Sequence, residues 1–174
     1  MAEKSEQLAD ECTRQSDSCL YTSTSLFIWL RVLRWVRVIF VVVPLVLGSL
    51  ASGKLLVKGD VKGAEHLAAV CAFLAGLLPA VYAALKFDDR LRECAALASE
   101  FKNLQDRFRQ AALVVSKKTF PEFERQFEAL MARLEAARKP SFTAPEWCFR
   151  AAQKKIASGD YKFDVDTNPR GTAT

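Results

Sequence analysis

The sequence predicts an all-α fold: a two-span transmembrane helical hairpin with a cytosolic helical bundle or coiled-coil-like extension. Three observations predict it. Two long runs, residues 38–53 and 67–85, contain no charged residue. An apolar repeat with helical spacing follows the second run and continues to Pro121 without an intervening Gly or Pro. The mean hydropathy of the 174 residues is only +0.04, so the average combines apolar spans with polar flanks.

Residues 1–25 are expected to form a flexible polar N-terminal tail. They contain two basic and five acidic residues, whereas the whole chain has a net charge of +5. A signal peptide would begin with basic residues followed by an apolar core, and this acidic start has neither. The chain is therefore expected to keep its N-terminus.

Residues 26–37 form a basic aromatic segment in front of the first span. Trp29 and Trp35 suit the headgroup level of a bilayer, as do Arg31, Arg34 and Arg37. Two alternatives are open. The segment either lies on the cytoplasmic surface as an interfacial helix or continues straight into the span.

The two uncharged runs have lengths that suit membrane spans over about 38–53 and 67–85. As helices they reach about 24 Å and about 28 Å, against a hydrocarbon core of about 30 Å. Six basic residues flank the outer ends of the runs and three lie in the connecting loop. This bias predicts multi-pass insertion with both termini in the cytoplasm. A pair of buried helices in a soluble bundle is the alternative.

Small residues recur at every fourth position of the second span, and the first span offers two pairs at the same spacing, Gly48 with Ser52 and Ser49 with Gly53. The predicted transmembrane packing residues are Ala68, Ala72, Gly76, Ala80 and Ala84, with Gly48 and Ser52. Small side chains let a second helix approach closely in lipid. The stripe is expected to pack either the two spans of one hairpin or the hairpins of neighbouring subunits.

Residues 86–163 are predicted to form a cytosolic helical region, followed by a loose tail at 164–174. The second span is expected to run directly into its first helix, whose heptad seam has a polar step at Gln105. Thr119 and Glu122 form a capping-box pattern before the next helix, and Thr143 and Glu146 repeat it. The predicted seam residues are Phe87, Leu91, Phe101, Phe108, Phe123, Phe127, Leu130 and Leu134.

Residues that carry catalysis or bind cofactors and metals are not evident. His66 is the single histidine, and the five cysteines show no C-x-x-C pairing. Neither a Gly-rich phosphate loop nor a basic patch of one sign is present, so no nucleic-acid partner is expected. The sequence therefore predicts no enzyme activity, no cofactor and no metal.

Three segments resemble a known family. They are LFIWLRVLRWVRVIF into the first span, AFLAGLLPAVYAALKFDDRL across the second, and APEWCFRAAQKKIASGDYKFDVD near the end. Over roughly residues 20–166 the chain resembles SLATT-domain proteins, two-span effectors associated with SMODS nucleotidyltransferases and SLOG proteins. The resemblance implies a bacterial antiviral defence system at the cell inner membrane, in which a sensor or nucleotide second-messenger synthase encoded nearby triggers a membrane effector.

Two functions are therefore expected from the sequence. The first is a pore-forming or membrane-disrupting effector whose partners are the lipid bilayer and further copies of the chain. The alternative is a membrane-anchored helical scaffold that recruits a cytosolic partner through its heptad seam.

Overall fold

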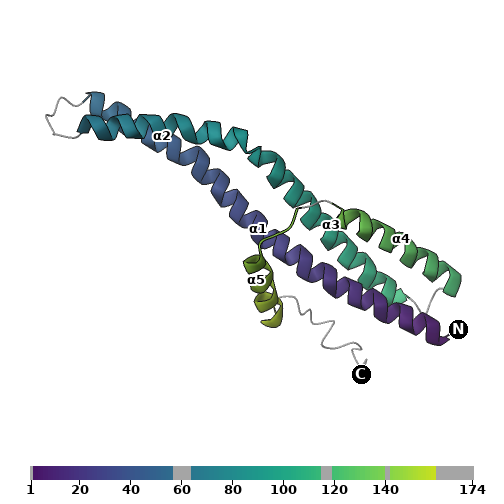
Figure 1. The fold of residues 1–174 in the computed structure, drawn as a ribbon. Helices are drawn as coiled ribbons and strands as arrows, with labels where there is room; N and C mark the ends of the chain where they lie inside the picture. Colours follow the sequence, from purple (N-terminus) through teal and green to yellow (C-terminus); the bar gives the residue numbers. More distant parts are fainter. Residues whose placement is uncertain (1, 57–63, 115–118, 140–141, 160–174) are drawn as a thin grey trace, which may run out of the picture. The chain divides into compact units, whose positions relative to one another are not determined.

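The computed structural model describes residues 2–56, 64–114, 119–139 and 142–159 (Figure 1). Every element in these ranges is an α-helix, which confirms the all-α prediction. The predicted tail at 164–174 and the loop between the spans lie outside these ranges. The helices are α1 (Ala2–Leu56), α2 (Ala64–Ala84), α3 (Phe87–Val114), α4 (Phe120–Arg138) and α5 (Glu146–Ala157).

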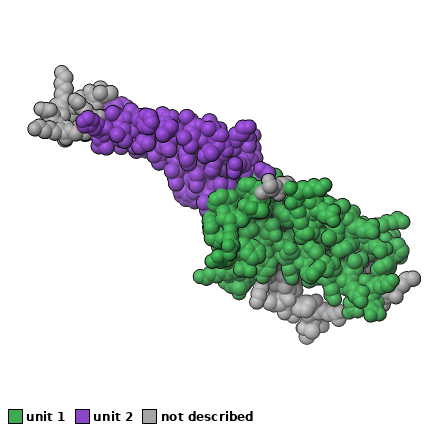
Figure 2. Space-filling model, viewed as in Figure 1, with its two compact units in different colours: residues 1–29, 94–174 green, residues 30–93 purple. Residues whose placement is uncertain are grey.

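The chain divides into two compact units, which Figure 2 colours separately. Unit 1 contains residues 1–29 and 94–174, and unit 2 contains residues 30–93. Helices α1 and α3 each contribute to both units, whereas α2 belongs to unit 2 and α4 and α5 belong to unit 1.

Helix α1 begins at Ala2, so the prediction of a flexible tail over 1–25 is wrong. The buried positions in this segment alternate by four and three residues, which places them on one helix face. They are Cys12, Ser16, Cys19, Ser23 and Leu26, and Thr24 and Ser25 are buried beside the last two. Six of these seven side chains are Cys, Ser or Thr, which pack closely but add little to the hydropathy of the segment. The helix also runs without a break through residues 26–37, so the straight alternative for that segment is the one observed.

Unit 1 is built around antiparallel contacts of α3. The Ser16 hydroxyl of α1 donates a hydrogen bond to the Gln105 backbone oxygen at 3.1 Å, and the Cys94 thiol donates to the Leu26 carbonyl at 3.7 Å. On α4, Arg133 forms a bidentate pair with Glu100 of α3 at 2.7 and 2.9 Å. These pairs fix α1 and α4 against α3. The polar Gln105 side chain is tolerated in the seam because its Oε1 accepts a hydrogen bond from Lys102 Nζ at 2.9 Å.

Helix α4 begins as its sequence pattern predicts. The Thr119 backbone N–H donates to the Glu122 carboxylate at 3.3 Å, which is half of a capping box. Helix α5 differs, because its N-cap is Pro145 and not Thr143, and the cap has no side-chain hydrogen bond. It ends with Ser158 at the C-cap and Gly159 at a φ of 92°, a conformation that glycine adopts at little cost.

In unit 2, the later part of α1 pairs with α2, and a turn separates α2 from α3. The expectation that the second span runs directly into the next helix is wrong, because α2 ends at Ala84 and Lys86 has a φ of 47°. A left-handed residue with a side chain interrupts the regular hydrogen bonding of a helix. The Asp89 N–H donates instead to the Lys86 carbonyl at 3.1 Å, at the first turn of α3.

Candidate functional site: an apolar helical hairpin

The most distinctive feature of unit 2 is an exposed apolar surface on both of its long helices. Two helices in the described residues are long and apolar enough to cross a membrane. Leu45 on α1 is 69% exposed and Phe73 on α2 is 67% exposed. Core helices of a soluble bundle bury such side chains. Most of the large exposed apolar residues in the described part of the chain lie on this hairpin and not on unit 1.

The two helices of the hairpin touch along a narrow, mostly small face. On α1 the shielded positions are Phe40, Pro44, Leu47 and Ala51, and on α2 they are Ala68, Cys71, Ala75, Leu78 and Tyr82. Both sets alternate by three and four residues, as in antiparallel coiled-coil packing. Of the predicted α2 stripe, only Ala68 belongs to this contact face.

The other four stripe residues lie elsewhere on α2. Ala72, Gly76, Ala80 and Ala84 are all exposed. A Cβ added at Gly76 would meet nothing within 4 Å. Packing between the two spans of one hairpin therefore does not account for these positions, and they remain available to another helix.

The predicted small pair on α1 has a different environment. Gly48 is partly shielded, and a Cβ there would also meet nothing within 4 Å. Ser52 is exposed, and its hydroxyl donates to the Gly48 carbonyl within the same helix. This internal bond satisfies the hydroxyl without a partner from another helix, as is common for Ser in membrane helices.

The five residues predicted at the membrane interface are spread around α1. Arg31 and Arg34 are exposed, and Trp35 is 65% exposed. Trp29 is partly buried because its ring packs edge-to-face on Trp147 of α5, with a centroid separation of 5.9 Å. Arg37 is also exposed but forms an ion pair inside unit 2.

That ion pair belongs to a cluster at the turn between α2 and α3. The Tyr82 hydroxyl donates to Asp88 Oδ1 at 2.7 Å, and Arg37 Nε lies 3.4 Å from the same oxygen. The rings of Phe40, Tyr82 and Phe87 meet with centroid separations between 5.3 and 6.4 Å. The cluster ties the first turn of α3 to both helices of the hairpin.

Sequence reasoning missed this cluster, although one signal was present. Tyr82 and Asp88 are six residues apart, which in a continuous helix would place them on different faces. Their contact requires the turn at Lys86, and a lysine gives no indication of a left-handed backbone. The adjacent acids Asp88 and Asp89, typical of a first helical turn, were the available sign that a new helix starts here.

The predicted seam residues lie on the inward faces of α3 and α4. Phe101, Phe108, Phe123, Leu130 and Leu134 are buried in unit 1. Phe87 and Leu91 of unit 2 and Phe127 of unit 1 are partly buried. The Phe108 and Phe127 rings meet at 6.3 Å, so the seam joins α3 to α4 within one chain.

Four of the five cysteines have their thiols buried in unit 1. Cys12, Cys94 and Cys148 have no exposed surface, and Cys19 is 1% exposed. Burial raises the pKa of the Cys12 and Cys19 thiols to about 11, and the neighbouring Glu11 charge adds to the effect on Cys12. These thiols therefore stay protonated and act as small packing groups.

No protein-family model, curated protein or solved structure matches the chain.

Proposed function

We propose that the chain is a membrane effector that inserts its hairpin in a bilayer, assembles with further copies and breaks the permeability barrier. The setting we propose, from the resemblance to SLATT-domain proteins, is a bacterial antiphage system with a nucleotide-linked sensor as the trigger. Both ends of the chain lie in the cytoplasm in this proposal.

The observation that carries the proposal is the outward apolar surface of unit 2. Along α2, large side chains such as Phe73, Leu77 and Val81 are exposed, by 67%, 41% and 38%. Each Å² of apolar surface left in water costs about 25 cal/mol, so such side chains favour lipid or another protein. Two helices of span length that share this property support membrane insertion.

Assembly is supported by the position of the small residues. The exposed stripe from Ala72 to Ala84 leaves the backbone of α2 open to a second helix, with Gly76 near its middle. In lipid, van der Waals packing across such a surface drives helix association. Several hairpins joined in this way would line or deform a pathway across the bilayer.

The test compares two variants that each add four carbon atoms to an exposed side of α2. Gly76→Leu blocks close approach at the stripe, whereas Val70→Phe adds the same bulk away from it. The chain is overexpressed in bacterial cells together with its genomic neighbours, and a potential-sensitive dye reports the membrane potential. We expect the wild type and Val70→Phe to depolarise the cells, and Gly76→Leu to reduce depolarisation and oligomer size together.

A wild-type chain that leaves the membrane polarised under these conditions contradicts the effector function. Equal activity of the two variants contradicts the stripe as the assembly surface. Neither variant is expected to disturb the hairpin, because a Cβ at Gly76 meets no neighbour and Val70 is 53% exposed.

A membrane-anchored scaffold is the second candidate, and the packed helices of unit 1 favour it. The buried seam of Phe101, Phe108 and Phe123 gives unit 1 a core of its own, as a recruiting module requires. Replacing residues 38–53 and 67–85 with an unrelated two-span hairpin separates the candidates. Retained function would support the scaffold, and lost function would support the effector.

A further inference from the structure

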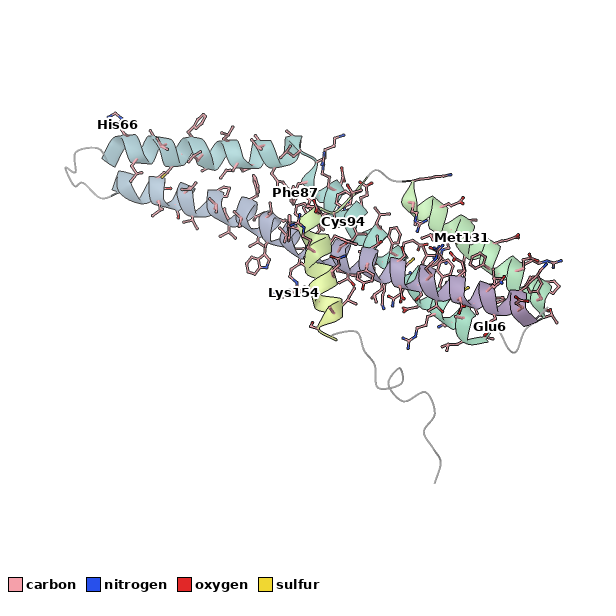
Figure 3. The ribbon with its side chains drawn as sticks, turned by 60° about the horizontal axis from the view of Figure 1, so that its bottom comes forward. Glu6, His66, Phe87, Cys94, Met131 and Lys154 are labelled. Atoms are coloured by element: carbon pink, nitrogen blue, oxygen red, sulfur yellow. The ribbon has the colours of Figure 1, made fainter. Side chains whose placement is uncertain are left out.

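The outward face of α1 changes from apolar to basic toward the end of the hairpin that carries Phe87, opposite His66 (Figure 3). The exposed side chains of this face follow at spacings of three and four residues, which keeps them on one side of the helix. They are Leu45, Val42, Val38, Trp35 and Arg31, and Arg34 lies one turn before Val38. The shielded positions that face α2, such as Phe40 and Pro44, lie on the other side. The apolar surface that suits lipid therefore leads without a break into two arginines.

Contacts inside unit 2 set the level of these arginines. The uncharged run at 67–85 ends three residues before Asp88, whose Oδ1 lies 3.4 Å from Arg37 Nε of α1. That run reaches about 28 Å across a hydrocarbon core of about 30 Å, so the core ends close to Arg37. Arg34 and Arg31 precede Arg37 by three and six residues, or about 4.5 and 9 Å of helix. In an inserted hairpin both guanidinium groups therefore reach the headgroup layer.

The charges of Arg31 and Arg34 are not neutralised by an acid. Residues 18–56 contain no Asp or Glu, and Asp88 of α3 pairs with Arg37 instead. Both arginines are exposed, and neither forms an ion pair within the described residues. Two permanent positive charges, one turn apart, are therefore available to an external anion.

The surroundings of the two arginines favour a lipid as the source of that anion. Residues three apart on a helix are neighbours, and the planar guanidinium fork matches the oxygens of a phosphate. Trp35 follows at the level that tryptophan prefers in membranes, and Val38 and Val42 then offer an apolar surface to acyl chains. A phospholipid contacts both parts of this face, whereas a free phosphate ion uses only the arginines.

We propose that Arg31 and Arg34 bind the phosphate of an anionic phospholipid whose acyl chains lie along Trp35 and Val38. The site holds this end of the hairpin at the headgroup level and gives the chain a preference for anionic membranes. This inference rests on the proposed insertion of the hairpin, and the experiment below distinguishes the failure of one from the failure of the other.

The experiment measures which lipid lies next to Trp35. The background is the full-length chain with Trp29→Phe and Trp147→Phe, so Trp35 is its single tryptophan. It is reconstituted in phosphatidylcholine bilayers that contain increasing fractions of either phosphatidylglycerol or phosphatidylcholine brominated near the glycerol end of the acyl chains. Quenching of Trp35 by the two brominated lipids gives their relative affinity at this position, and circular dichroism checks the fold.

Two pairs of substitutions are compared in this background. Arg31→Gln with Arg34→Gln removes the proposed site. Arg107→Gln with Arg125→Gln is the matched control, because it lowers the net charge equally at exposed positions of α3 and α4. A third arm replaces chloride in the buffer with inorganic phosphate at equal ionic strength.

We expect the background chain and the control to prefer phosphatidylglycerol at least about fivefold, as one basic residue at a membrane surface provides. Loss of Arg31 and Arg34 should reduce the preference to about onefold. Inorganic phosphate should leave the preference unchanged, because a free anion gains nothing from the apolar face.

Equal affinity for the two lipids in the background chain, or an equal loss in both pairs of substitutions, would overturn the inference. Loss of the preference in inorganic phosphate would also overturn it, since a free anion would then be the occupant. In each of these cases, quenching by brominated phosphatidylcholine still leaves the proposed insertion intact. If neither brominated lipid quenches Trp35, the proposed insertion fails, and the inference fails with it.

Discussion

At the scale of single residues, the buried thiols make unit 1 less stable as the pH becomes alkaline. Cys12 and Cys19 are almost completely buried, and their pKa is raised from 9.0 to about 11. In the folded chain they keep their protons up to that pH, whereas the unfolded chain begins to lose them near pH 9. The proton-linked stabilisation is therefore complete below about pH 9 and decreases as the pH rises toward 11.

We predict that the free energy of unfolding decreases more steeply with pH in the wild type than in a Cys12→Ala, Cys19→Ala variant. Between pH 8 and pH 10, the wild type should lose about 1 kcal/mol more of its free energy of unfolding for each thiol than the variant loses. Denaturant unfolding at pH 8 and pH 10 measures it, because lysine and tyrosine titration is common to both chains. Identical slopes for the two chains would show that the thiols are not shielded in unit 1.

At the scale of elements, the predictable helices are those whose inward faces carry large apolar side chains. The Phe and Leu repeat of α3 and the capping box of α4 were both recognisable in the sequence, since each has a strong local signal. The first half of α1 has the same spacing, but Ser16 and Ser23 occupy its buried positions. A search for hydropathy misses such a face even though its periodicity is intact.

The break between α2 and α3 was hidden for a related reason. Lys86 adopts the left-handed backbone conformation that a glycine in the sequence would have indicated. The contacts that hold this turn, from Tyr82 and Arg37 to Asp88, exist only after folding. The sequence also could not predict that most of the α2 stripe is exposed. A repeat of small residues shows that a helix can be approached closely, but not which helix approaches it.

Helix α1 provides a direct test of its buried face, because neighbouring residues differ sharply in exposure. We predict that Cys19→Arg destabilises unit 1 by more than about 3 kcal/mol, since it buries a charge without a partner. Ser18→Arg, one residue earlier on the exposed side, should change the stability by less than about 0.5 kcal/mol. Limited proteolysis and thermal unfolding compare the two variants. If both behave like the wild type, residues 2–25 do not pack in unit 1.

At the scale of the whole molecule, the two units differ in how much apolar surface they expose. Unit 1 buries its large apolar side chains among α1, α3, α4 and α5, whereas unit 2 presents them outward along α1 and α2. The near-zero mean hydropathy of the chain conceals this division. The proposal that this division supports is that unit 2 crosses a membrane twice, with both termini on the same side.

Thiol accessibility in spheroplasts of bacterial cells that express the chain tests this claim most directly. The four native cysteines of unit 1 are buried, and Cys71→Ala removes the partly exposed one, so a cysteine introduced at an exposed position dominates labelling by a membrane-impermeant maleimide. His66→Cys places a thiol at the start of α2, and Asn103→Cys places one on the exposed side of α3. We predict labelling at position 66 in intact spheroplasts and at position 103 only after the membrane is permeabilised. Labelling of both positions, or of neither, before permeabilisation would contradict a hairpin that crosses the membrane twice.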